Sequence, residues 1–169
     1  MKAEILSARE EGDSIGGTVE CHILGVDAPI GSPFFHSQES ELAALIFSIP
    51  AVKGIEFGEG FAFAGMRGSQ ENDALQYEGN KVISLTNHNG GLNGGIANGM
   101  PIVFRVVVKP TPSIFLPQQT VNLGTKENIT HQIEGRHDPC IVPRAVPVIE
   151  AAAALTVLDG YLCDGYALL

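Results

Sequence analysis

Charged residues are scarce in this chain of 169 residues, and basic residues are scarcer than acidic ones. Ten lysines and arginines against nineteen aspartates and glutamates give a formal net charge of −9. Such a surface repels a polyphosphate backbone over most of its area, so we expect no nucleic-acid partner. A small anionic ligand stays compatible with this charge if the few bases gather in one place. The candidates are Lys53, Arg67, Arg105, Lys109, Arg136 and Arg144.

Cysteines and long apolar runs are also few. The three cysteines, Cys21, Cys140 and Cys163, form no CxxC pair, which argues against a disulfide framework or a zinc ribbon. No apolar run approaches the roughly 20 residues that cross a bilayer, and the start of the chain is too short and too acidic for a signal peptide. These absences predict a soluble, cytoplasmic protein with reduced thiols and no membrane partner.

What the chain does have is enough apolar residues for one core. Hydrophobic residues make up 44% of it, the proportion of a packed globular protein. A chain of this length buries on the order of 70% of the surface that it exposes when unfolded. We therefore expect a single domain over residues 1–169.

Hydrophobic periodicity predicts a β-α-β order in the first part of the chain. Ser37 is suited to cap the helix, whose apolar residues recur at helical spacing. The helix should stop before Pro50, because the residue that precedes a proline is pushed out of the α region. A Gly/Pro-rich turn over residues 27–33 connects the first strand to this helix. The predicted strands cover residues 17–26, 51–57 and 61–66.

A polar segment from residue 68 to 91 is rich in Asn, Gln, Ser and Gly. Loops of this length are uncommon in compact domains unless they are mobile or functional. We therefore predict a mobile loop here, either disordered or involved in binding.

The second half of the chain contains the strongest strand pattern. Residues 101–108 are dense in β-branched side chains, which predicts a well-buried strand that ends at Lys109. Weaker extended stretches follow at 121–124 and 129–133. Residues 146–162 are apolar on nearly every face, which predicts a helix buried between layers.

Residues 90–99 contain five glycines in ten positions. Such a run lets the backbone approach a planar or phosphorylated ligand closely. It lacks the Gly-Lys-Ser/Thr ending of a P-loop and the GxGxxG order of a dinucleotide site. A tight turn between two strands explains the run equally well.

Residues 135–140 place a guanidinium, an imidazole, a carboxylate and a thiol within a few positions. One interpretation is a surface turn in which Asp138 caps the next segment and pairs with Arg136. Zinc binding by His137 and Cys140 lacks a second ligand pair in the sequence. A Cys140 nucleophile activated by His137 needs an orienting group and an oxyanion site that the sequence does not identify.

Several motifs together are similar to those of chorismate synthases, and they follow in the family's order. The carboxy-terminal signature is carried by residues 136–140 and 145–151. The earlier matches are residues 12–17, 51–56, 68–70 with 72–73, the glycine-rich run, and 109–111. The resemblance covers residues 12–162 but only about half of the family's usual length, with the amino-terminal half absent.

The resemblance implies an α+β fold, a β-α-β sandwich with helices packed between antiparallel sheets. It also implies a reaction in which phosphate is eliminated from 5-enolpyruvylshikimate 3-phosphate to give chorismate, with reduced FMN as cofactor. Family members are usually homotetramers. The alternative is a non-catalytic fragment that serves only as a flavin-binding or oligomerisation module.

The resemblance also implies roles for individual residues. Asp138 corresponds to the catalytic aspartate near the flavin N5, and Arg136 to an arginine that contacts FMN and lies near the substrate. No metal is implied, and the family's two catalytic histidines belong to the half that is absent. Pro112 stands where many members have serine, which removes a hydroxyl and an amide donor. The further flavin contacts implied are Ala51, Gly94, Lys109, Pro110, Thr111, Pro112 and Ser113.

Overall fold

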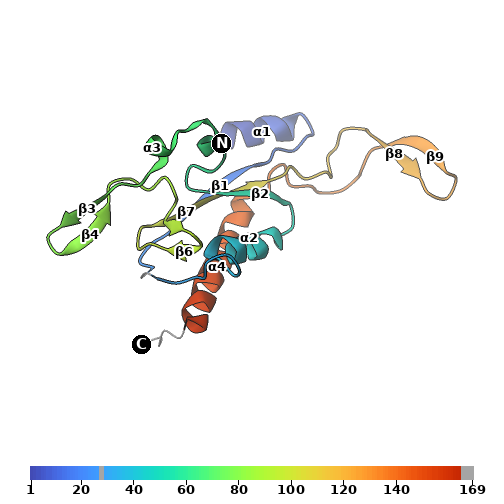
Figure 1. Ribbon diagram of the computed structural model, residues 1–169. Coiled ribbons are helices and arrows are strands. Elements are labelled where there is room, and N and C mark those ends of the chain that lie inside the picture. The colour runs from blue at the N-terminus through green and yellow to red at the C-terminus, as the bar shows by residue number, and fades with distance from the viewer. Residues whose placement is uncertain (27–28, 165–169) are drawn as a thin grey trace.

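The structure is a computed structural model that describes residues 1–26 and 29–164. Residues 27 and 28 of the predicted turn and residues 165–169 of the predicted domain lie outside this description. Figure 1 shows a body of sheet and helices from which two hairpin arms, β3–β4 and β8–β9, extend in opposite directions. In chain order the elements are α1 (Lys2–Glu10), β1 (Gly17–Ile23), α2 (Gln38–Phe47), β2 (Val52–Phe57), the 3₁₀ helix η1 (Gly60–Gly65), α3 (Gly68–Glu71), β3 (Leu75–Glu78), β4 (Lys81–Ser84), β5 (Leu92–Asn93), β6 (Ile96–Ala97), β7 (Ile102–Val108), β8 (Gln118–Asn122), β9 (Glu127–His131) and α4 (Val142–Cys163).

The sheet of the body has the order β1-β7-β2, and both outer strands run antiparallel to β7. Gly17, the first residue of β1, and Val52, the first of β2, both pair with Val108, the last of β7. The chain segments before β1, before β2 and after β7 therefore meet at one end of the sheet.

Strand β7 forms the centre of the core, as the density of β-branched residues predicts. Its residues alternate, with Ile102, Phe104, Val106 and Val108 fully buried on one face. Helices α2 and α4 pack against each other and cover that face (Figure 1). The side chain of Ser37 accepts a hydrogen bond from the N–H of Ser40 and caps α2, as expected. The α+β class predicted from the sequence is confirmed.

Helix α4 carries two apolar stripes. The inner stripe is buried against the sheet and α2, and consists of Val142, Ile149, Ala152, Ala153 and Thr156. The outer stripe follows the same heptad spacing but faces solvent: Val148 is 47% exposed, Leu155 58%, Leu158 41% and Leu162 57%. The predicted helix is confirmed, whereas its predicted burial between layers holds only for the inner stripe in the described chain.

By length and composition α4 is also apolar enough to cross a membrane. This corrects the expectation that no apolar segment approaches that length. The helix begins at Val142, four residues earlier than predicted, because Pro143 lies in the first turn, where a missing N–H breaks no hydrogen bond. The core helices of soluble proteins have the same properties, so one such helix is a weak indication of a membrane span.

Residues 61–65 belong to the 3₁₀ helix η1, so the strand predicted over 61–66 is wrong. Gly58 and Gly60 have φ angles of +54° and +53°, which turn the chain away from the strand direction. The N–H of Phe61 then donates to Oε2 of Glu56 at 3.0 Å. This bond lowers the pKa of Glu56 more than burial raises it, and Arg105 adds to the lowering.

The segment 68–91, predicted as a mobile loop that is disordered or involved in binding, contains a short helix and the β3–β4 hairpin. Gly79, with a φ of +61°, makes the turn of this hairpin. The hairpin projects from the body (Figure 1). Its mobility stays a prediction.

Asp73 anchors the base of this arm. Its side chain is 8% exposed and accepts four hydrogen bonds, from Thr86 Oγ1 and the His88 N–H at 2.7 Å and from the N–H and Nδ2 of Asn89 at 3.0 Å. Burial raises the pKa of this carboxyl, but the bonds from Asn89, Thr86 and His88 outweigh it and lower the pKa to about 2.

We expect Asp73→Ala to destabilise the β3–β4 arm at pH 7 by about 2 kcal/mol, because an ionised carboxylate with several donors is lost. The folded-state pKa lies below the ordinary value of 3.8. Asp73 therefore stabilises the arm above about pH 4, and this contribution is lost as the pH falls towards 2. Hydrogen exchange in residues 75–84 measures the effect. Glu78→Gln, at the exposed tip, is the control, and equal exchange in both variants would contradict the prediction.

Candidate active site

Three loops meet at the end of the sheet where β1 and β2 begin and β7 ends. They are residues 12–17, 109–115 and 135–140. Four hydrogen bonds join them: the Ile15 N–H donates to the Pro139 carbonyl at 2.8 Å, Ser14 Oγ to the Thr111 carbonyl at 2.6 Å, the Phe115 N–H to the Gly12 carbonyl at 2.8 Å, and Thr111 Oγ1 to the Asp138 carbonyl at 3.0 Å. The hydroxyl of Thr111 therefore holds two of the predicted site segments together.

Ala51 belongs to the same end of the sheet. Its carbonyl accepts the N–H of Lys109 at 2.9 Å, which ties the predicted flavin loop to the residue before β2. Ala51 has a φ of +71°, in the left-handed region that non-glycine residues rarely adopt. Such a conformation costs roughly 1 kcal/mol or more and is found most often at functional sites.

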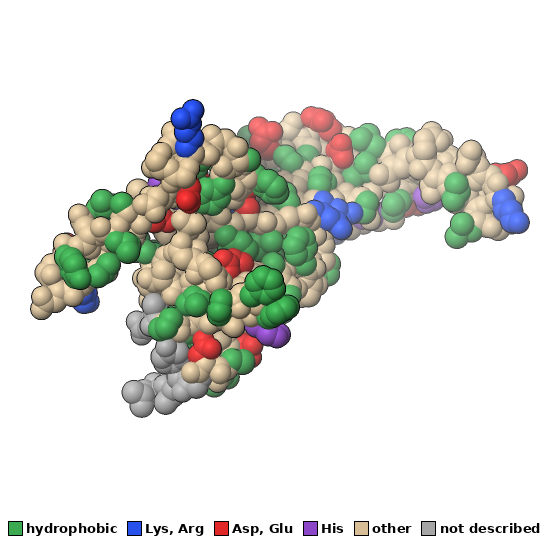
Figure 2. Space-filling model, viewed as in Figure 1, with side chains coloured by type: hydrophobic (Ala, Val, Ile, Leu, Met, Phe, Trp, Pro, Cys, Tyr) green, Lys and Arg blue, Asp and Glu red, His purple; other side chains and the backbone are tan. Residues whose placement is uncertain are grey.

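A cavity of about 330 Å³ lies between residues 113–115 and 135–139. Its polar wall includes Arg9, Asp13, Ser113, Arg136, His137 and Asp138. Figure 2 shows one basic patch where the β8–β9 arm leaves the body, the part of the chain to which both loops belong (Figure 1). Three predicted site residues thus line one cavity: Ser113, Arg136 and Asp138.

Asp138 forms an ion pair with Arg144, whose Nη1 lies 2.8 Å from Oδ2 of the carboxylate. The two side chains are 42% and 76% exposed, so the pair contributes at most about 1 kcal/mol to stability. The surface-turn interpretation paired Asp138 with Arg136 and made it a cap, and both details are wrong. The residue before α4 is Ile141, and no side chain caps the helix there.

His137 packs its ring against Phe115, with ring centroids 5.4 Å apart. Its Nε2 atom is buried and has no hydrogen-bond partner in the described part of the chain. Within residues 1–26 and 29–164, no three histidine, cysteine, aspartate or glutamate side chains lie close enough to hold a metal ion. A zinc site at His137 and Cys140 therefore has no support there.

Gly94 lies apart from these residues in the chain. It occupies the turn between β5 and β6, with a φ of +60°, which confirms the tight-turn interpretation of the glycine-rich run. The hairpin is fixed beside α2 by a bond from the Gln38 N–H to the Gly95 carbonyl at 3.0 Å. It precedes β7, whereas Lys109 follows β7, a strand of seven residues that spans on the order of 20 Å. The predicted flavin contact of Gly94 stays a prediction.

Arg105 lies on the opposite face of the sheet from the helices. Its Nε donates to Glu56 Oε1 at 2.7 Å, and its Nη2 to the Gly58 carbonyl at 2.9 Å. Oε2 of Glu20, on the neighbouring strand β1, lies 3.8 Å from Nη1 of Arg105. Arg105 is therefore held by the sheet and is not one of the bases at the cavity.

Arg9 is a charged cavity residue that the sequence analysis did not identify. It belongs to helix α1, which was not predicted, and which places it beside the loop 12–17. The only signal in the sequence is its position directly before a motif that resembles the family.

The comparisons with known proteins agree with one another. The profile of the chorismate synthase family matches residues 1–162. A chorismate synthase of Dehalococcoides mccartyi is 52% identical over 159 residues, which cover 94% of this chain and 44% of that protein. One of Methanosarcina mazei is 51% identical over 166 residues, covering 98% and 46%. A crystal structure of chorismate synthase superposes with a TM-score of 0.77 at 32% identity and covers 96% of this chain and 42% of that chain.

The chain thus spans less than half of the length of these relatives. The family match nevertheless extends over nearly all of its residues, and the solved relative shares its fold. The chain belongs to the chorismate synthase family.

Proposed function

We propose that this chain carries part of a chorismate synthase active site. Together with the part of a full-length family member that lies outside the matched region, here called the remaining length of the family, it eliminates phosphate from 5-enolpyruvylshikimate 3-phosphate to give chorismate, with reduced FMN as cofactor. The observation that carries the proposal is the cavity in which Arg136 and Asp138 meet the loop that begins at Lys109. Family membership supplies the identity of the reaction.

The residues present fit an anionic, planar cofactor. Neither Lys109 nor Arg136 has an ion-pair partner within residues 1–26 and 29–164, so both charges are available to a phosphate or to an electron-rich ring. The buried Nε2 of His137 has no partner there either. When bound, FMN would supply the reduced flavin that the family's reaction requires, although that reaction involves no net redox change. Ala51 and Thr111 position the loop that would hold it.

Asp138 is proposed to take up or relay the proton that leaves C6 of the substrate. Its ion pair with Arg144 engages Oδ2 and leaves Oδ1 without a hydrogen bond inside the described chain. The carbonyl of the same residue is fixed by Thr111. The side chain is thereby oriented at the cavity while one oxygen stays accessible to a proton.

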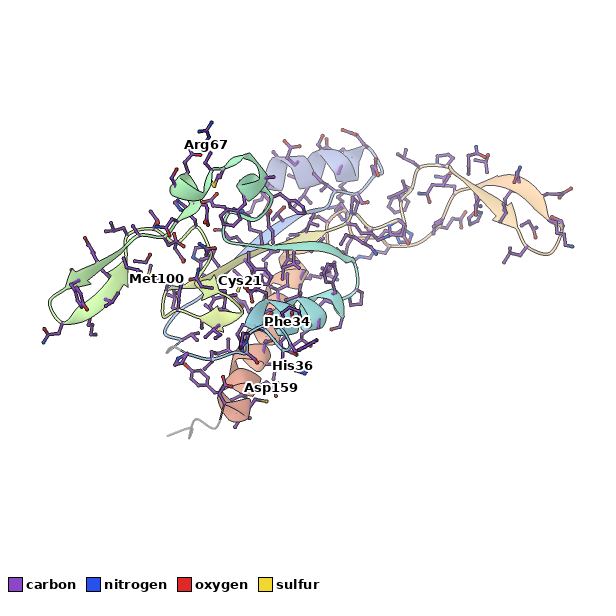
Figure 3. All side chains as sticks on the ribbon, in the orientation of Figure 1. Cys21, Phe34, His36, Arg67, Met100 and Asp159 are labelled. Atoms are coloured by element: carbon purple, nitrogen blue, oxygen red, sulfur yellow. The ribbon has the colours of Figure 1, made fainter. Side chains whose placement is uncertain are left out.

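The remaining length of the family is proposed to cover the outer stripe of α4. The three-stranded sheet covers one side of α2 and α4, and the exposed leucines lie on another. Near this face, Phe34 and Phe35 are 86% and 73% exposed, and Figure 3 places Phe34 beside His36 and Asp159 where α2 and α4 meet. A cytoplasmic homotetramer is the assembly we expect. These exposed faces also favour the second candidate function, an oligomerisation module.

The isolated chain should bind reduced FMN at least 100-fold more weakly than the chain assembled with the remaining length, because solvent does not replace the missing contacts. An anaerobic fluorescence titration measures the dissociation constant of each. In the assembled protein, Arg136→Ala should weaken binding, whereas Arg67→Ala should not, because Arg67 projects away from the body (Figure 3). Tight, stoichiometric binding by the isolated chain would count against the proposal.

A further inference from the structure

Helix α1 contributes no buried side chain to the core, yet its last turn is fixed at the cavity. The N–H of Asp13 donates to the Ala8 carbonyl at 2.8 Å, and the N–H of Gly12 to the Arg9 carbonyl at 3.1 Å. Gly12 in turn accepts the Phe115 N–H at 2.8 Å. The helix is therefore placed by the site loops and not by hydrophobic packing.

Gly12 and Phe115 approach each other closely. The φ of Gly12 is +73°, and a Cβ atom there would lie 3.3 Å from Cβ of Phe115, tighter than ordinary van der Waals contact. A glycine therefore suits both the backbone conformation and the approach of α1 to the cavity wall.

The side chain that this arrangement brings to the cavity is Arg9. Arg9 and Arg136 come from different elements and line the same space, and neither has an ion-pair partner in residues 1–26 and 29–164. The cavity wall also contains two carboxylates. Asp138 is paired with Arg144, so Asp13 is the one carboxylate of the wall without an ion-pair partner in the described residues. In a chain with a net charge of −9, two unpaired guanidinium groups at one cavity form a local cationic site.

Two guanidinium groups suit an anion that has several oxygens. Each presents a planar fork of N–H donors, which matches the oxygens of a phosphate or a carboxylate. A lysine provides only a point charge and no fork, so the two residue types are distinguishable in a test.

We propose that Arg9 is a second anion-binding side chain of this cavity and acts with Arg136 on a phosphate or carboxylate group of the bound molecule. The nature of that molecule rests on the proposed function, whereas the anion site itself rests on the geometry of the two arginines. The anion belongs either to the flavin or to the phosphorylated substrate.

The direct test is a titration of the ¹⁵N-labelled chain with inorganic phosphate at pH 7, followed through the arginine Nε–Hε resonances. We expect saturable shifts for the Arg9 and Arg136 resonances. Arg9→Ala should weaken phosphate binding at least 10-fold, and Arg9→Lys should weaken it less. Arg67→Ala is the matched control and should leave the affinity unchanged. No saturable shift in the unaltered chain, or an unchanged affinity in Arg9→Ala, would overturn the inference.

The source of the anion is decided in the chain assembled with the remaining length of the family. If Arg9 holds the flavin phosphate, Arg9→Ala weakens the binding of FMN but not of riboflavin. If it holds the substrate, the same change raises KM for the substrate and leaves FMN binding intact. Either result supports the inference, and the absence of both effects overturns it.

The inference and the proposed function fail in different experiments. Phosphate binding that depends on Arg9, in an assembly without lyase activity, would refute the proposed function and leave the anion site standing. Normal turnover together with phosphate binding that is independent of Arg9 would refute the anion site alone.

Discussion

Replacing Asp138 with asparagine is expected to lower the rate of phosphate release by about 100-fold or more in the assembled protein, the usual scale for the loss of a general acid or base. Asparagine keeps the shape of the side chain, and its carbonyl oxygen can still accept a bond from Arg144. It no longer accepts a proton. Flavin binding should change little, because Arg136 and Lys109 are untouched.

Anaerobic single-turnover kinetics with reduced FMN in excess would measure this effect on the chemical step. Glu78→Gln is the matched control, because Glu78 is an exposed residue at the tip of the β3–β4 arm that does not line the cavity. It should leave the rate within about two-fold of the unaltered protein. A rate for Asp138→Asn equal to that of the control would remove Asp138 from the reaction.

The double change Leu155→Asp and Leu158→Asp is expected to abolish association with the remaining length of the family. Both leucines belong to the outer stripe of α4 and are 58% and 41% exposed in the chain. Full burial of a leucine contributes about 1.5–3 kcal/mol, and two aspartates in the same contact would in addition be buried without partners. The isolated chain should keep its fold, since neither side chain belongs to the core.

Co-purification with the part of the Dehalococcoides mccartyi relative that lies outside the matched region would measure this association. A control with Val121→Asp and Leu123→Asp changes two apolar residues of the β8–β9 arm that are 53% and 87% exposed. The control variant should still associate. Equal recovery of the complex with either pair of changes would show that the outer stripe of α4 is not the contact surface.

The parts of the fold that the sequence predicts are those in which local pattern and tertiary packing agree. Strand β7 is dense in β-branched residues and lies at the centre of the sheet, with alternate residues buried. Helix α2 begins at the expected cap and ends before Pro50. The extended stretches around 121–124 and 129–133 are the β8–β9 hairpin, with bounds shifted by a few residues.

The elements that sequence reasoning missed have little hydrophobic pattern. Helix α1 buries no side chain, and both strands of the β3–β4 hairpin are four residues long, so neither has the periodicity that identifies an element. Their positions depend on contacts with distant residues. The hydrogen bonds from the Phe115 N–H to the Gly12 carbonyl and from the Asn89 N–H to the Asp73 carboxylate are examples.

The candidate site is likewise predicted only in part from the sequence. The family motifs identify Arg136, Asp138 and the Lys109 loop, and the antiparallel order of the sheet brings them together. They do not indicate that Arg144 pairs with Asp138, or that Gly94 lies at the other end of β7. Such relations depend on where helices begin and how strands pair, which short motifs do not specify.

The most direct test of the account is an anaerobic assay of phosphate release from 5-enolpyruvylshikimate 3-phosphate with reduced FMN. The isolated chain and the chain assembled with the remaining length of the family would be compared at equal concentration. The account predicts no release above background from the isolated chain and sustained turnover from the assembly. Turnover by the isolated chain, or an inactive assembly that has bound reduced FMN, would contradict it.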